Sequence, residues 1–523
     1  MLAIIAVNYA IGWVGVRVPS MAFMVPPATW IFNCVILLLN ERYNGYSWVA
    51  LLGIGGLGGE SWDSPRGHAA LWLDNHRGVF PWFRLFNLVV LRMISFNMDR
   101  HWAALQIVPR DRDGGVITFE KHQRKCLEGC MIRGREGACL WWREKDSHAL
   151  SSYTPLAYFA YLFYVPLHFA GPTITFNSWL GQIVHPQRSY TPLGVAWYAL
   201  GRTGFIFLVL EAWLHLFYVF SFTNSPAFLG FSPYGMALVS YFTLVAIWLK
   251  FTALWRFFRC WSLLDGVEPP ENMSRCVSNN YSVQSFWRGW HRSFNRWLVR
   301  YVYVPLGGGG GGAASPATTA ATGDGKSSSS SAAASSGGVL AALWSSYSTR
   351  YPRLAPLTRQ LANVFLTFSF VAFWHDRTMQ LLAWGWMIAL LFAPELGAQA
   401  LCNTRALKPL KTRWYWRHIK GVGAAMSIFT MMVTNEENHA RGRAQPRTGV
   451  RRAEECESVS SLTLAVCLVL CVLLCPGRQF GRLQRGHPRH LVNPAHDGDA
   501  GRIHHVRAHL RDLLLGEHDH VRM

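Results

Sequence analysis

Long apolar stretches separated by short basic or glycine-rich connectors dominate the first 433 residues. A helix of about 20 apolar residues crosses the hydrocarbon core of a bilayer, and shorter stretches tilt, re-enter or thin the membrane around them. The pattern predicts an all-α, polytopic membrane protein. The predicted spans are Leu2–Val18, Met24–Leu39, Trp82–Phe96, Leu156–Phe169, Val195–Phe220, Met236–Phe258, Leu361–His375, Leu381–Leu396, Gly421–Val433 and Leu462–Leu474.

The composition agrees with a membrane protein. Hydrophobic residues make up 51% of the 523-residue chain, and charged residues make up 15%, against about a quarter in soluble domains. The formal net charge is +21, which in a soluble chain would suggest a nucleic-acid partner. Here the basic residues lie between apolar spans, so we assign them to cytoplasmic loops beside membrane lipids and expect no nucleic-acid partner.

Two segments depart from the membrane pattern. Gly307–Gly338 consists almost wholly of Gly, Ala, Ser and Thr, which cannot bury a core, and predicts a disordered insertion in a membrane domain of residues 1–433. Residues 434–523 contain a single aromatic residue, Phe480, and no lysine, and only Leu462–Leu474 resembles a helix. This tail is either a genuine polar extension or a sequence read in a wrong frame or across an intron. We favour the second explanation and predict a disordered tail.

The chain contains 11 cysteines. Several lie in or beside apolar runs, where they act as small hydrophobic residues. His122, Cys126, Cys130 and Cys139 instead share the polar loop Pro109–Asp146. A zinc site is one interpretation, but the spacing matches no common ligand frame and favours unpaired thiols.

The stretch Thr367–Trp386 places His375 at the end of an uncharged, apolar run and just before Asp376 and Arg377. An ionisable side chain at membrane depth needs a partner or a task. Two roles fit a histidine here. It could be a core residue that hydrogen-bonds Asp376 or a backbone carbonyl, or a general base, for which its ordinary pKa is well suited.

The stretch Asn280–Gly307 predicts one continuous helix with two neighbouring faces. One face carries the rings of Trp287, Trp290, Phe294, Trp297 and Tyr301, and the adjoining arc carries Arg288, His291, Arg292 and Asn295. In such a helix His291 and Asn295 lie one turn apart. A membrane-surface helix that binds anionic head groups without any chemistry fits the same pattern. A second histidine beside basic side chains nevertheless favours the catalytic interpretation of His375.

Several blocks of this sequence, in order, resemble the membrane-bound O-acyltransferase family. The similarity is to its glycerol uptake protein branch, which is related to hedgehog acyltransferase. The blocks are LRMISFNMD (Leu91–Asp99), YVPLHFAGPTITFN (Tyr164–Asn177), LLDGVEPPENMSRCVSNNYS (Leu263–Ser282), FWRGWHRSFNRWLVRYVYVPLGG (Phe286–Gly308) and FVAFWHDRTMQLLAWGW with APE (Phe370–Glu395).

This resemblance implies a multi-helix fold with a tunnel, located in the endoplasmic reticulum membrane. It also implies that His375 is the catalytic histidine and that His291 holds the second polar position of the active site. The implied reaction moves a fatty acyl group from acyl-CoA to a lyso-lipid hydroxyl during remodelling of glycosylphosphatidylinositol (GPI) anchors.

The residues suggest how such a reaction would run. His375 would take the proton of the acceptor hydroxyl, and His291 or Asn295 would orient the acceptor or stabilise the oxyanion. Arg288 and Arg292 would hold coenzyme A phosphates, while Trp287 and Trp290 would line the acyl channel or simply pack. We expect no covalent intermediate, bound cofactor or metal in the reaction.

Two other functions remain open on the sequence alone. The first is polyol or glycerol transport, although transporters usually carry internal repeats and none is evident here. The second is an inactive lipid-binding regulator, which the unusual tail would fit and the presence of both histidines would not.

Overall fold

The computed structural model describes most of the chain up to Arg443. The described residues are 1–43, 47–55, 61–76, 82–109, 115–126, 130, 137–225, 230–280, 282–306, 347–351, 354–375, 378–402, 404 and 411–443. Their regular elements are all helices, which confirms the predicted fold class. The predicted insertion Gly307–Gly338 and the predicted helix Leu462–Leu474 lie outside these residues. The expectations for them and for the tail therefore stay predictions.

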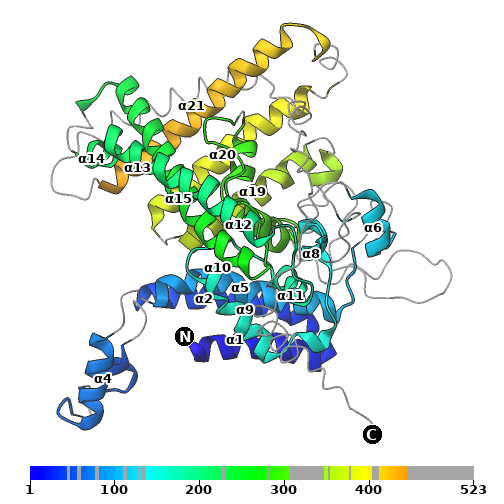
Figure 1. The fold of residues 1–523 in the computed structure, drawn as a ribbon, viewed down its shortest axis with the longest axis vertical. Helices are drawn as coiled ribbons and strands as arrows, with labels where there is room; N and C mark the ends of the chain where they lie inside the picture. Colours follow the sequence, from blue (N-terminus) through cyan, green and yellow to red (C-terminus); the bar gives the residue numbers. More distant parts are fainter. Residues whose placement is uncertain are drawn as a thin grey trace. The chain divides into compact units, whose positions relative to one another are not determined.

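The chain divides into two compact units, and Figure 1 labels their helices. Unit 1 contains Met1–Ala199 and Leu254–Pro270. Unit 2 contains Leu200–Ala253 and a second stretch that begins at Glu271.

A single buried helix, α5 (Trp82–Ala104), forms the core of unit 1. Every side chain from Val89 to Trp102 is buried, although the helix was predicted as a span from its apolar first half alone. Four other helices pack on α5. They are α1 (Leu2–Arg17), α2 (Val25–Arg42), α9 (Pro155–Leu162) and α11 (Phe176–Val184).

Asparagines join these helices through buried hydrogen bonds. Asn97 donates to the backbone oxygen of Asn8 at 2.8 Å, and Asn8 donates to the Tyr158 hydroxyl at 2.9 Å. Asn33 of α2 donates to the Asn8 side-chain oxygen at 2.8 Å. Because a buried amide is costly unless it is hydrogen-bonded, these contacts fix the register of α1, α2 and α5.

Within the described residues, four helices are long and apolar enough to cross a membrane, and α1 is a shorter apolar helix. Three of these four helices each contain a predicted span in full. The fourth, Pro192–Phe217, contains most of the predicted span Val195–Phe220. This last helix consists of α12 (Pro192–Trp197), a π-helical segment and α13 (Phe205–Phe217). The other three are Pro19–Asn40, Tyr234–Leu264 and Met379–Cys402.

The predicted span Leu156–Phe169 is wrong, because the chain forms two short helices there. Helix α9 ends at Leu162, and α10 (Val165–His168) follows after a break at Tyr164. The cause is Pro166, which has no N–H to donate and whose ring would clash with the Leu162 carbonyl in a continuous helix.

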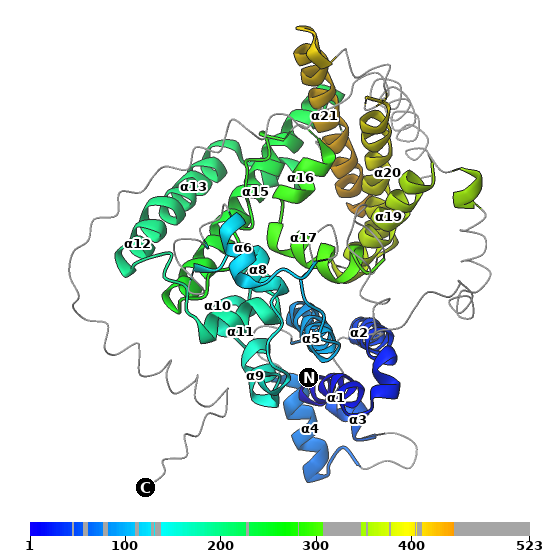
Figure 2. The ribbon, with the colours of Figure 1, turned by 90° about the vertical axis from the view of Figure 1, so that its right-hand side faces the viewer.

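In unit 2, α19 (Ala355–His375) packs along α20 (Met379–Cys402), and α21 (Trp416–Arg443) packs on α20 (Figure 2). Gly385 allows α19 and α20 to approach closely, since a Cβ atom there would lie 3.0 Å from the Phe368 carbonyl oxygen. This pairing places the end of α19, and with it His375, beside the segment that carries His291.

Candidate active site

The helix predicted for Asn280–Gly307 is broken at His291. Helix α16 (Val283–Gly289) ends before Trp290, whose backbone is extended, and α17 (Arg292–Leu298) begins after His291. The backbone of His291 is left-handed, with φ 43°. The continuous-helix prediction is therefore wrong at two residues, even though the apolar and basic spacing runs through them without interruption.

Asn272, in a loop upstream of α16, explains the break. Its backbone oxygen accepts a hydrogen bond from the Arg292 N–H at 2.9 Å, and its side-chain oxygen accepts one from the Ser293 N–H at 3.0 Å. These N–H groups belong to the first turn of α17, where a helix has no internal acceptors. A buried loop residue thus caps α17 and replaces the turn that would have continued α16.

Asn272→Ala should disturb this break, because it removes the acceptor of the Ser293 N–H and leaves a buried donor unpaired. We expect a loss of about 1–3 kcal/mol in the free energy of unfolding and a lower kcat. Thermal unfolding and turnover kinetics in detergent would measure both effects. Asn272→Asp keeps the acceptor oxygen and is the matched control. If Asn272→Ala left both quantities at the wild-type level, this capping role would be wrong.

The break brings the two predicted histidines to the same aromatic ring. The centroid of the Phe294 ring lies 5.2 Å from that of His291 and 6.4 Å from that of His375. Trp374 supports this arrangement, because its ring lies 4.6 Å from Phe294 and 4.7 Å from His375. His291 and His375 therefore lie near each other in unit 2, although 83 residues separate them in the sequence.

The surroundings of His291 keep its imidazole neutral. Burial lowers the pKa of His291 well below its ordinary value, and the neighbouring His375 lowers that pKa further. A neutral imidazole offers one donor and one acceptor, so it can orient a hydroxyl or donate to an oxygen. His375 itself is exposed at the end of α19. Its proposed partner Asp376 lies outside the described residues.

The predicted basic strip does not follow one helix. Arg288 is exposed in the last turn of α16, whereas Arg292 is half-buried at the start of α17, on the other side of the break. Asn295 is half-buried, and its N–H donates to the His291 carbonyl at 3.0 Å. That bond keeps Asn295 one turn from His291, as predicted.

The two predicted channel tryptophans pack against other rings. Trp290 stacks on Phe286 at 5.5 Å. Trp287 makes edge-to-face contacts with Phe368 of α19 at 5.4 Å and Trp384 of α20 at 5.7 Å. The buried indole N–H of Trp287 has no hydrogen-bond partner within the described part of the chain. This N–H is a donor that a bound substrate could satisfy.

Comparison with known proteins places this arrangement in a family. The model of the membrane-bound O-acyltransferase family matches residues 75–322 and 351–435, which include both histidines and the broken helix. The chain belongs to this family.

The family members that this chain resembles include fungal proteins. It is 34% identical to the membrane-bound O-acyltransferase gup1 of Schizosaccharomyces pombe, over 70% of this chain and 52% of the relative. It is 33% identical to GUP1 of Saccharomyces cerevisiae, over 78% of this chain and 58% of the relative. The match to the protein-cysteine N-palmitoyltransferase HHAT of Mus musculus is weaker, at 28% identity over 28% of this chain and 30% of the relative. The chain spans about half the length of the fungal relatives it matches.

Glu395 supports the candidate site and was not singled out from the sequence. It is buried in α20, and its carboxylate accepts hydrogen bonds from the Gln284 N–H and the Gln399 side chain, both at 3.1 Å. Gln284 lies in the first turn of α16, where a negative charge is favourable. Glu395 thus attaches α16 to α20. The sequence could have indicated this residue by its charge, because Glu395 is the one charged residue in the apolar stretch Met379–Cys402.

Proposed function

We propose that this chain transfers a fatty acyl group from acyl-CoA to the hydroxyl of a lyso-lipid. We further propose that the acceptor is a GPI-type lipid and that the protein acts in the endoplasmic reticulum membrane. The observation that carries the proposal is the placement of His291 and His375 on either side of Phe294. Membership of an O-acyltransferase family supports the same type of reaction.

In the proposed reaction, His375 is the general base. Its imidazole takes the proton of the acceptor hydroxyl while the hydroxyl oxygen attacks the thioester carbonyl. The tetrahedral intermediate then collapses, the C–S bond breaks, and the proton passes from His375 to the departing thiolate of coenzyme A. The acyl group thus ends on the acceptor oxygen and the proton on the thiol of coenzyme A. No covalent acyl-enzyme forms.

His291 serves this reaction as a neutral donor. Its low pKa keeps the ring uncharged at neutral pH, so it does not compete with His375 for a positive charge. Its N–H, or the side-chain amide of Asn295, would orient the acceptor or stabilise the negative charge that develops on the carbonyl oxygen. The buried N–H of Trp287 offers a further donor for the acyl chain's carbonyl.

A direct assay tests this function. The purified full-length chain, incubated in detergent or liposomes with labelled acyl-CoA and lysophosphatidylinositol, should yield the diacyl lipid. A lyso-GPI acceptor should react at a higher kcat/KM than lysophosphatidylinositol if the glycan is recognised. No transfer to either acceptor, from a well-folded preparation, would contradict the proposal.

Arg288 and Arg292 are proposed to bind the phosphates of coenzyme A. Arg288→Ala should raise the KM for acyl-CoA by about tenfold while leaving the KM for the lyso-lipid unchanged, since one charge-assisted hydrogen bond contributes about 1.5–3 kcal/mol. Because Arg288 is exposed, this loss should come with little change in stability. Steady-state kinetics with each substrate varied in turn would measure it.

Arg413 gives the matched control for this prediction, because it is another exposed arginine of unit 2, outside the segment that carries His291. Arg413→Ala should leave both KM values at the wild-type level. Equal effects of Arg288→Ala and Arg413→Ala would indicate a general effect of surface charge and would remove Arg288 from the proposed donor site.

A further inference from the structure

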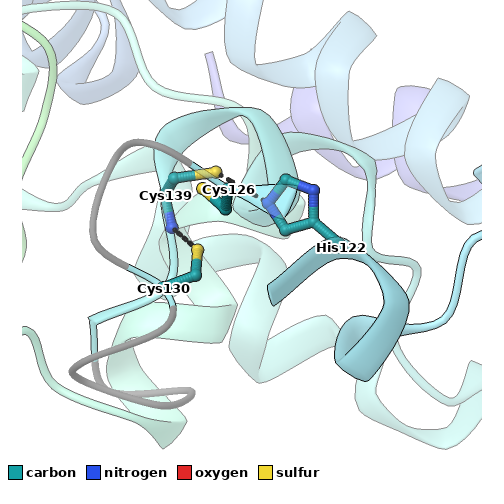
Figure 3. A group of neighbouring side chains, drawn as sticks. All are labelled: His122, Cys126, Cys130 and Cys139. Atoms are coloured by element: carbon teal, nitrogen blue, oxygen red, sulfur yellow. Dashed lines mark hydrogen bonds between the residues drawn. The ribbon is translucent and has the colours of Figure 1, made fainter. Parts of the chain in front are cut away.

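Four potential metal ligands converge in unit 1, apart from the histidine site. The side chains are His122, Cys126, Cys130 and Cys139, and their ligand atoms all lie within 4.8 Å of one another. Figure 3 shows the imidazole and the sulfur atoms directed toward a common centre. His122 lies in helix α6 (Phe119–Lys125), Cys126 directly follows it, and Cys139 directly precedes α8 (Leu140–Lys145).

The spacing of these atoms fits a tetrahedral zinc ion. With Zn–S bonds of about 2.3 Å and a Zn–N bond of about 2.0–2.1 Å, the ligand atoms of this tetrahedral site would lie about 3.5–3.8 Å apart. His122 Nε2 already lies 3.2 Å from Cys139 Sγ. The other pairs of ligand atoms, at 4.8 Å or less, exceed the tetrahedral spacing by at most about 1 Å. We propose that His122, Cys126, Cys130 and Cys139 bind a structural zinc ion.

The chemistry of the ligand set selects zinc. Three thiolates and one imidazole are soft or borderline donors, which suit zinc and exclude the oxygen-preferring ions magnesium and calcium. No carboxylate takes part in the cluster. Four protein ligands fill a tetrahedral zinc ion completely, which is the pattern of structural and not catalytic sites.

Neighbouring groups already orient two of the ligands. The His122 ring stacks against two tryptophans, 4.9 Å from Trp141 and 5.4 Å from Trp142. The Cys139 N–H donates to Cys130 Sγ at 2.9 Å, the kind of outer contact that stabilises a metal-bound thiolate.

Among the described residues of this loop, the buried hydrophobic core is small. Its local core consists of Phe119, Cys130, Ala138, Cys139 and Trp142. Two of these five are the proposed ligands, and so small a core contributes little stability by itself. A bound zinc ion would connect α6 to α8 and stabilise both.

Helix α8 is also hydrogen-bonded to other parts of unit 1. The buried Arg143 of α8 donates to the Gln182 side chain of α11 at 3.1 Å and to the Glu268 carbonyl at 3.2 Å. Trp142 and Arg143 also form one wall of a small pocket whose other wall includes Asn177 and His185. Zinc would therefore fix the wall of this pocket through α8.

Metal analysis of the purified full-length protein tests the proposal. The wild-type chain should contain about one zinc ion per molecule, and cobalt exchange should give the visible absorption of a tetrahedral, thiolate-bound cobalt ion. Cys139→Ser should lose the metal. Cys34→Ser, which alters a cysteine of α2 outside the cluster, should retain it.

Two substitutions of His122 separate metal binding from packing. His122→Phe keeps a ring beside the two tryptophans but removes the nitrogen ligand, and it should lose most of the zinc. His122→Cys supplies a fourth thiolate and should retain zinc, because four cysteines also form a structural site. The zinc contents of these two His122 variants can be compared even if Cys139→Ser fails to fold.

Two results would overturn the proposal. One is an equal zinc content in wild type, His122→Phe and Cys139→Ser, which would place the metal elsewhere. The other is a metal-free wild-type protein in which mass spectrometry finds two of the three cysteines joined as a disulfide. A chelator that lowers the Tm of the wild type but not of His122→Phe would support the stabilising role.

Discussion

Replacing His375 with alanine should lower kcat for acyl transfer by about 10²- to 10⁴-fold, the range that a general base contributes. His375 ends α19 and is exposed beside Trp374 and Phe294. Its removal deletes the proposed proton acceptor and leaves the packed rings in place. The substitution should therefore change stability very little. Transfer of labelled acyl groups by matched amounts of purified protein would measure the loss.

A second histidine of unit 2 provides the control. His418 is exposed in α21, and His418→Ala should retain the wild-type kcat. The pH profile adds an independent readout. In the wild type, kcat should fall as the pH is lowered, because a protonated imidazole cannot accept the hydroxyl proton. Wild-type turnover by a folded His375→Ala protein would exclude His375 as the base.

Replacing His291 should also lower kcat, by about ten- to a hundredfold, which is less than for His375 because an orienting donor is easier to replace than a base. The substitution must respect the left-handed backbone at this position. Glycine adopts this conformation freely, and asparagine tolerates it better than most residues. His291→Gly thus removes the imidazole without backbone strain, and His291→Asn returns a hydrogen-bond donor.

The two His291 variants distinguish a chemical role from a structural one. If the imidazole acts on the substrate, His291→Asn should recover part of the activity that His291→Gly loses, while both proteins unfold near the wild-type Tm. If His291 serves only to allow the helix break, His291→Gly should keep full activity. The second outcome would remove His291 from the proposed mechanism.

The sequence alone was enough to predict most of the long apolar helices and the family. Apolar runs such as Leu381–Leu396 carry their helical preference locally, and α20 contains that run. The ordered blocks that resemble the O-acyltransferases agree with the family match. His375 was singled out because an ionisable residue at the end of an apolar run is unusual, and this signal needs no knowledge of its neighbours.

The tertiary structure decided what the local pattern could not. The spacing around His291 favours a continuous helix, but Asn272 caps the Ser293 N–H from 21 residues earlier in the chain and stabilises a break. In the same way, His122 and the three cysteines match no common ligand spacing, and the packing of α6 and α8 brings them together. Helical periodicity depends on neighbours within one turn. Caps and ligand clusters depend on contacts between distant segments, and these exist only in the folded chain.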